Sequence, residues 1–171
     1  LLLSLFTFAF RDLPAEAQKL RDLKQGDLRD KIFETYVHRR YEREVRKPHS
    51  NIPFPLSKIY RLLGKLALRQ TRSWLRLFGD ESDLSIKQLG IVLGLDAQET
   101  ESFVDMSIRL NLLAIKGENA VQFIHSLLRD YFVFVYSMML LDSETDNMLD
   151  KVNAVYALGL LQEQRALKQL L

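Results

Sequence analysis

The sequence contains no cysteine, and it has only four prolines, three histidines and one tryptophan among its 171 residues. Without cysteine the chain cannot form disulfides, thiolate zinc sites or cysteine nucleophiles, and this composition fits a reducing compartment such as the cytoplasm. The histidines, His38, His49 and His125, lie far apart in sequence and form no HExxH motif. These absences argue against a metal site and against a disulfide-stapled secreted domain.

The sequence also has no hydrophobic run long enough to span a bilayer. Its first ten residues are mostly apolar, but they lack a methionine, a basic flank and a small-residue cleavage site. We interpret this stretch as a buried helix in a piece of a longer protein, and we expect no membrane partner. The formal net charge of +2 is close to balanced, so bulk electrostatics does not indicate a nucleic-acid binder.

The sequence is rich in helical periodicity. Apolar side chains recur in steps of four over residues 27–45, which predicts an amphipathic helix capped by Asp27. A loop containing three prolines follows, and a second long helix is predicted over residues 56–78. Along this second helix, basic residues recur every three or four positions and fall within an arc of about 80°. This basic ridge consists of Lys58, Arg61, Lys65, Arg69, Arg72 and Arg76.

Two short helices and a hairpin are predicted after residue 84. Ser85 with Gln88, and Asp96 with Glu99, have the capping-box pattern that starts a helix. Residues 113–116 and 120–124 flank a turn at Gly117 and are typical of a short β-hairpin. This layout predicts a winged helix.

DNA binding is the obvious function of a winged helix, but the charge of its second helix argues against it. That helix and its cap carry four acidic residues against one arginine, a net charge of −3 on the element that would approach phosphates. These residues are Asp96, Glu99, Glu101, Asp105 and Arg109. The basic ridge has three interpretations: a solvated face, a surface that docks on this acidic helix or on a neighbouring subunit, or a site for nucleic acid, which is the least favoured.

The predicted fold is all-α: a helical bundle, a winged helix with a small β-hairpin, and a HEAT-like α-hairpin at the end. We expect a helical domain over residues 1–83, the winged helix over 84–141 and the start of a repeat region over 142–171. Within the last region, residues 157–171 have the pattern of a helix, a tight turn near Gln162 and Glu163, and a second helix.

His125 is the main candidate for a functional residue, because it stands between the predicted hairpin and a long apolar helix. It could be a satisfied core or capping residue, a metal ligand, a catalytic base or a phosphate contact. The chain has no GxxxxGK[ST] loop and no acidic residue placed for magnesium, so this region is not expected to hydrolyse ATP. No GxSxG motif is present either, and Ser126 beside His125 does not make a catalytic triad.

Three segments, 1–6, 32–37 and 123–132, resemble in this order the region that follows the nucleotide-binding core of NACHT-type STAND NTPases. Residues 157–159 and 165–166 are similar to a HEAT-type repeat. The resemblance implies a molecular switch in signal transduction, in which helical and winged-helix domains fold over ADP bound to an ATPase core. It implies that His125 contacts the β-phosphate of ADP, and that the region holds no cofactor alone, while the parent protein binds ADP or ATP with Mg. The implied partners are the upstream core in the same chain, a C-terminal repeat sensor and further copies in an active homo-oligomer.

Overall fold

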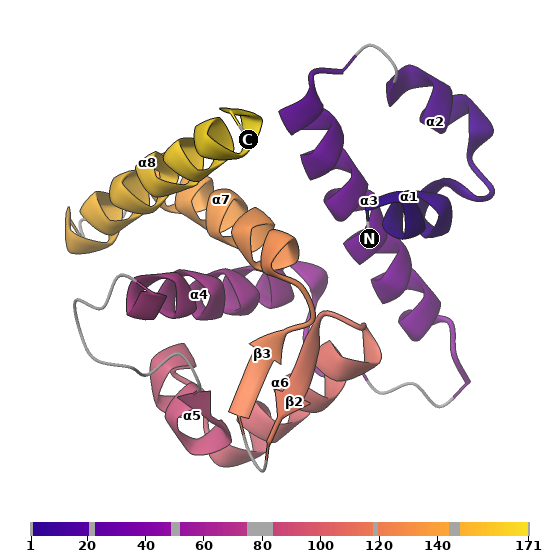
Figure 1. Cartoon of the computed structure of the whole chain (residues 1–171). Coiled ribbons are helices and arrows are strands. Elements are labelled where there is room, and N and C mark those ends of the chain that lie inside the picture. Colours follow the sequence, from indigo (N-terminus) through magenta and orange to yellow (C-terminus); the bar gives the residue numbers. More distant parts are fainter. Residues whose placement is uncertain are drawn as a thin grey trace.

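The computed structural model describes residues 2–20, 23–48, 52–74, 84–117, 120–143 and 148–170. Over these residues the chain is mostly helical, with one small antiparallel sheet (Figure 1). The helices are α1 (Leu2–Phe10), α2 (Pro14–Lys19), α3 (Gln25–Val45), α4 (Leu56–Trp74), α5 (Ile86–Leu93), α6 (Ala97–Arg109), α7 (Ser126–Asp142) and α8 (Met148–Leu170). The strands are β1 (Leu84–Ser85), β2 (Leu113–Lys116) and β3 (Ala120–Phe123).

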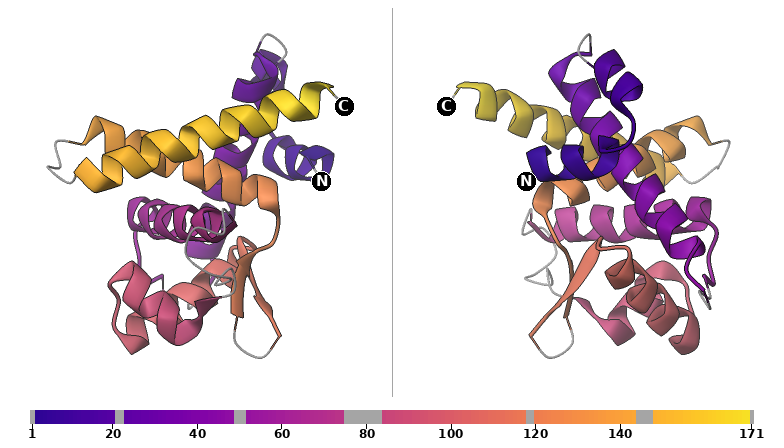
Figure 2. Two further views of the ribbon diagram at one scale, coloured as in Figure 1. Left: turned by 60° about the vertical axis from the view of Figure 1, so that its left-hand side comes forward. Right: turned by 90° about the vertical axis from the view of Figure 1, so that its right-hand side faces the viewer.

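Helices α8, α7 and α4 lie in successive layers, with α7 in the middle (Figures 1 and 2). Helices α5 and α6 and the sheet lie on the other side of α4, and α1 packs across α3 at one side of the molecule. The buried face of α4 carries the apolar positions that its periodicity predicts, since Ile59, Leu63 and Leu66 are all completely buried. In the described part of the chain, every helix is too short or too polar to cross a lipid bilayer.

A glycine allows α4 and α7 to approach each other closely. A Cβ atom added at Gly64 would overlap the Cβ and ring atoms of Tyr136 on α7. Interiors are close-packed, so this contact leaves no room for a side chain at position 64. Gly64 therefore sets the spacing of the two central helices.

The sheet has the strand order β1-β3-β2, and both pairings are antiparallel. Strands β2 and β3 form the predicted hairpin, with Ile115 opposite Val121 and with Gly117 at a φ of 60° in the turn. The hairpin prediction is confirmed. Strand β1 was not predicted; it pairs Leu84 with Val121 and so places β3 in the centre.

The predicted capping boxes are confirmed. Ser85 Oγ accepts from the Gln88 amide at 3.3 Å, and Asp96 Oδ1 accepts from the Glu99 amide at 2.7 Å. The predicted cap of α3 is wrong, because this helix begins at Gln25, its N-cap position is Lys24, and no side chain caps it. Asp27 lies inside the first turn, where its negative charge still suits the positive end of the helix dipole.

Helix α3 is joined to α6 and to the turn after it by two polar contacts. Asn111 Nδ2 donates to Tyr36 Oη at 2.9 Å. Arg109 Nη1 lies 3.3 Å from Glu44 Oε1, and the Glu44 side chain is only 5% exposed. Burial of a carboxylate is costly unless it is paired, and Glu44 is paired twice, with Arg109 across the contact and with Lys47 just after α3.

The predicted tight turn near Gln162 and Glu163 is wrong. Helix α8 runs without interruption from Met148 to Leu170, so residues 157–171 do not form a HEAT-like α-hairpin among themselves. The segment 162–168 contains only residues that favour helix, and nothing in it breaks the backbone hydrogen bonds. Helix α8 instead packs along α7 through Ala154, Ala157 and Leu161, which are buried.

Residues from all three predicted domains contribute to one hydrophobic core. This core includes Phe33 on α3, Leu66 on α4, Phe103 on α6, Phe132 on α7 and Leu161 on α8. Helix α4, from the first predicted domain, packs against both α5 and α7. The boundaries at residues 83 and 141 remain predictions.

Candidate functional site

His125 occupies the N-cap position of α7, two residues after the end of β3. Its backbone is extended, and its ring is half-buried. The Nδ1 atom accepts a hydrogen bond from the backbone N–H of Leu127 at 3.1 Å. The side chain therefore stabilises the first turn of α7, as Asp or Ser would at other helix starts.

This cap determines which ring nitrogen of His125 remains for another contact. In a neutral imidazole whose Nδ1 accepts, Nε2 carries the proton and is a donor. Within the described residues no hydrogen bond to Nε2 is present. The geometry thus combines a capping role, which the sequence left open, with one N–H that an anion could accept from.

The charged residues that follow His125 on the first turns of α7 pair with each other. Arg129, one turn further along α7, donates from Nη2 to Asp130 Oδ1 at 3.1 Å, and Asp130 is buried. His125 lines neither of the two hollows described below. Within the described ranges, His, Asp and Glu side chains nowhere gather in a group of three that could hold a metal ion.

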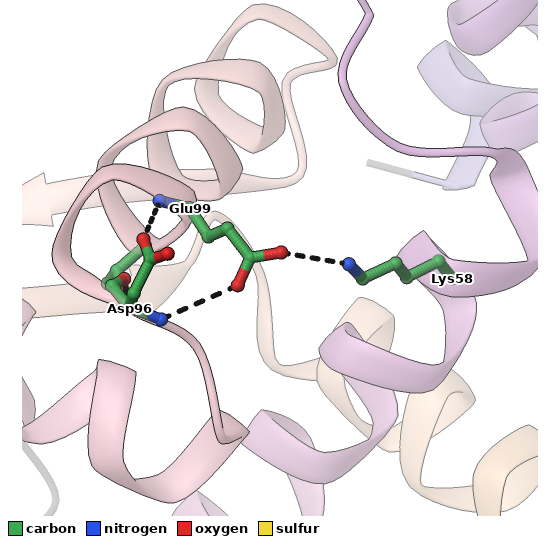
Figure 3. Close-up of polar contacts among 4 residues, drawn as sticks. Lys58, Asp96 and Glu99 are labelled. Carbon is green, nitrogen blue, oxygen red and sulfur yellow. Dashed lines mark hydrogen bonds and ion pairs between the residues drawn. The ribbon is translucent and has the colours of Figure 1, made fainter.

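The first residue of the basic ridge docks on the acidic helix. Lys58 Nζ lies 3.2 Å from Glu99 Oε1, which joins the first turn of α4 to the first turn of α6 (Figure 3). The Lys58 ammonium also lies 4.5 Å from the centre of the Phe54 ring. Of the three interpretations of the ridge, docking on the acidic helix therefore holds for Lys58.

Glu99 serves two purposes at once. One carboxylate oxygen faces Lys58, while Oε2 accepts from the backbone N–H of Asp96 at 3.4 Å to complete the capping box (Figure 3). Farther along α6, Asp105 pairs with Arg109 at 3.2 Å. Much of the acidic character of α6 is thus taken up by contacts within the protein.

The other ridge positions differ in exposure. Arg61 is exposed, whereas Lys65 and Arg69 are half-buried beside the apolar face of α4. The backbone of Arg72 continues α4, but its side chain lies outside the described part, and so does the whole of Arg76. The described ridge positions thus lie on one helix, and none of them lines either of the two hollows described below.

One hollow next to α4 was not predicted from the sequence. It has a volume of about 600 Å³ and lies among α3, α4 and α7, with Asp27, Glu34 and His38 on one wall and Tyr60 and Tyr131 on another. The two tyrosine hydroxyl oxygens are 3.3 Å apart. Burial raises the pKa of Tyr60 to about 12 and raises that of Tyr131 further, so both hydroxyls stay protonated at neutral pH. They act as neutral hydrogen-bonding groups.

Comparison of the chain with protein-family models, with curated proteins and with solved structures gave no match. Any assignment of function therefore depends on the chemistry of the residues described above.

Proposed function

We propose that this chain is the regulatory helical and winged-helix region of a NACHT-type STAND NTPase. In this proposal it holds a nucleotide-bound core in a closed state and transmits the state of a repeat sensor to oligomerisation. The region itself performs no catalysis, and the attached core binds ADP or ATP with Mg. The proposal also places the parent protein in the cytoplasm.

The arrangement of elements around the sheet supports a winged helix. Helix α4 comes first, β1 leads into α5 and α6, and the hairpin β2–β3 follows, with β3 between the other two strands. A winged helix has this order of helices and strands. The capping boxes of α5 and α6 fix where each helix begins, so the local sequence supports the same arrangement.

The placement of His125 is the observation that carries the proposal. The chain leaves β3 at Phe123 and enters α7 at Ser126, so His125 lies at the step between the sheet and the helix. The positive end of a helix favours an anion at this position. With Nδ1 fixed by Leu127, the ring presents Nε2 as a donor in a defined orientation.

Such a contact would act as a switch only if it differed between two states. A nucleotide stabilises the closed state by the contacts that it makes there and lacks in the open state. One hydrogen bond from Nε2 to a phosphate oxygen is charge-assisted and contributes about 1.5 to 3 kcal/mol. That is enough to shift a balanced equilibrium by more than tenfold in favour of the closed state.

A plain interaction scaffold is the second candidate, and the cap itself favours it. The Leu127 N–H that could bind a phosphate already donates to His125. In a scaffold, His125 would serve only to start α7, and Lys58 with Glu99 would serve only to dock α4 on α6.

A DNA-binding winged helix is less favoured. Asp96 and Glu99 are held at the start of α6 by the capping box, and Asp105 and Arg109 pair with each other. A gel-shift assay with this chain tests it, and we expect no retardation at a physiological ionic strength of about 0.15 M. Tight binding that weakens steeply with salt would support DNA binding instead.

The experiment for the proposed function compares two substitutions of His125 in the protein that carries the nucleotide-binding core. His125→Ala removes both the cap and Nε2, whereas His125→Asn keeps a capping oxygen and removes Nε2. If His125 holds a phosphate, both variants release ADP at least tenfold faster and oligomerise without a signal.

The matched pair also separates the switch from the scaffold. If His125 is only a cap, His125→Asn retains ADP and remains monomeric like the unsubstituted protein. Thermal unfolding of both variants supplies the control, because only His125→Ala should lose the stability that the cap contributes.

A further inference from the structure

A second hollow, of about 460 Å³, lies between α1 and α3. Three arginines line it: Arg11 from the end of α1, and Arg39 and Arg43 from one face of α3. Among the side chains that the structure describes, Asp12 supplies the one carboxylate in its lining. Its walls therefore carry an excess of positive charge in a chain whose overall charge is nearly balanced.

One of the three guanidinium groups has a structural role. Arg39 Nη1 donates to the Ala9 carbonyl at 2.8 Å, and Nη2 donates to Asp12 Oδ2 at 3.2 Å. This arginine satisfies a carbonyl at the C-terminal end of α1, where backbone acceptors have no partner within the helix. Asp12 is thereby occupied by Arg39 and leaves the other two arginines uncompensated.

Arg11 and Arg43 are the available cations. Both are exposed, and in the described part of the chain neither forms an ion pair. The Arg43 guanidinium lies 5.0 Å from the centre of the Phe8 ring, which holds it over the apolar part of the hollow. Phe8 also contacts the Arg40 guanidinium at 4.4 Å, so its ring is fixed within a cationic environment.

The lining combines this charge with apolar surface. Leu3 and Phe8 form part of the wall, and the Leu3 side chain is 78% exposed. A hollow of this volume with apolar walls and a few convergent polar groups has the dimensions of a small-molecule site. A volume of about 460 Å³ is also too small to hold an extended peptide or a nucleic-acid strand along its length.

We propose that the hollow between α1 and α3 binds a small phosphomonoester whose organic part is aromatic or apolar. A phosphomonoester carries about −1.5 to −2 charges at neutral pH and presents three acceptor oxygens. Two guanidinium groups match that charge, and their planar donor pairs suit phosphate oxygens. Leu3 and Phe8 contact the organic part. This site lies apart from His125 and does not depend on the function proposed for it.

Phenyl phosphate is the probe, titrated into the 171-residue chain by calorimetry. We expect saturable binding that weakens with salt, and clearly weaker binding of inorganic phosphate and of phenol, because each lacks half of the recognised groups. Arg11→Gln and Arg43→Gln should each weaken binding about tenfold, as loss of a charge-assisted hydrogen bond predicts. Arg43→Lys keeps the positive charge, so it should bind phenyl phosphate more tightly than Arg43→Gln does.

Arg46→Gln is the matched control. Arg46 lies on the same helix end, is 79% exposed and pairs with Glu42, but it does not line the hollow. Its substitution should leave phenyl phosphate binding unchanged. Equal losses in Arg43→Gln and Arg46→Gln would show non-specific attraction and overturn the proposal.

Amide chemical shifts of the unsubstituted chain give a measurement that needs no variant. On addition of phenyl phosphate, the perturbed amides should cluster in α1 and in the last two turns of α3. Absence of binding, or perturbations confined to other elements, would overturn the site. A phosphotyrosine peptide that binds more than tenfold tighter than phenyl phosphate would overturn the assignment to a small molecule.

Discussion

The hydroxyl oxygens of Tyr60 on α4 and Tyr131 on α7 lie 3.3 Å apart, and they form a polar contact between two helices that also contribute many apolar side chains to the core. Either hydroxyl can donate to the other. Because both are removed from water, ionisation of either one is unfavourable. This pair makes the stability of the fold sensitive to high pH.

The raised pKa values predict a loss of stability in alkaline solution. The folded chain keeps the Tyr60 proton up to a pH of about 12, whereas the unfolded chain releases it near pH 10. The stabilisation is therefore complete below pH 10 and is lost as the pH rises from 10 through 12. Urea unfolding at pH 8, 10 and 11 should show this decline.

Tyr131→Phe removes one of the two ionising groups and should make the decline above pH 10 shallower. Tyr156→Phe, at an exposed position of α8, is the control and should leave the decline unchanged. The same steep decline in both variants would show that the pair is not its source.

Gly64→Ala should lower the free energy of unfolding by about 1 to 3 kcal/mol, because the new methyl group overlaps Tyr136 and forces α4 and α7 apart. Gly159→Ala is the matched control in α8. A Cβ atom there meets nothing within 4 Å, so alanine should stabilise the helix by about 0.5 to 1 kcal/mol. Urea unfolding measures both, and a Gly64→Ala variant as stable as the original would contradict the close approach.

Asp96→Ala should cost about 1 kcal/mol in unfolding free energy, because the Glu99 amide loses its acceptor at the start of α6. Asp96→Asn keeps an acceptor oxygen, so it should lower the free energy of unfolding by only a few tenths of a kcal/mol. Thermal unfolding compares the two. Equal losses would mean that the charge of Asp96, rather than its hydrogen bond, stabilises the helix.

Gln70→Leu should destabilise the chain by about 1 to 3 kcal/mol. The Gln70 side chain is buried, and its Nε2 donates to the Val121 carbonyl on β3 at 2.9 Å, so leucine would leave that carbonyl without this donor. Thr71→Val serves as the control, since the Thr71 hydroxyl bonds a carbonyl of its own helix in the described part of the chain, and should change stability by less than about 0.5 kcal/mol. Equal losses of unfolding free energy in the two variants, measured by chemical unfolding, would argue against the hydrogen bond from Gln70 to Val121.

The features predicted correctly from the sequence are those set by neighbouring residues. The caps at Ser85 and Asp96 each depend on a partner three residues away, and the hairpin around Gly117 depends on a short turn. Gly94, with a φ of 71°, ends α5, and glycine is the residue most often found in this left-handed conformation at helix ends. Each of these features depends on residues within a few positions of one another, so it can be predicted without knowing the tertiary structure.

The features that were missed depend on residues far apart in sequence. Strand β1 has two residues and exists only because Val121 lies beside Leu84. Docking of the basic ridge on the acidic helix was among the interpretations, but the specific partner of Lys58, Glu99, lies 41 positions away and no local pattern identifies it. The tight turn near Gln162 was predicted from a repeat pattern, and the helix-favouring residues there give one continuous helix instead.

The candidate site could be predicted only in part. The position of His125 at the start of α7 follows from the change of period after the hairpin, and a capping role was among the alternatives. Its use of Nδ1 rather than Nε2 depends on the local backbone geometry, which no sequence pattern specifies. The arginine-lined hollow was not found because Arg11 and Arg43 come together only when α1 crosses α3.

The contacts of α3 with Asn111 and Arg109 have a mechanical consequence. To pull α3 away, a force would have to separate Glu44 from Arg109 and leave this buried carboxylate with Lys47 as its ion-pair partner. That cost in free energy makes movement of α3 relative to α6 unfavourable. Displacement of α3 should therefore be resisted at Arg109 and Asn111, shortly before strand β2.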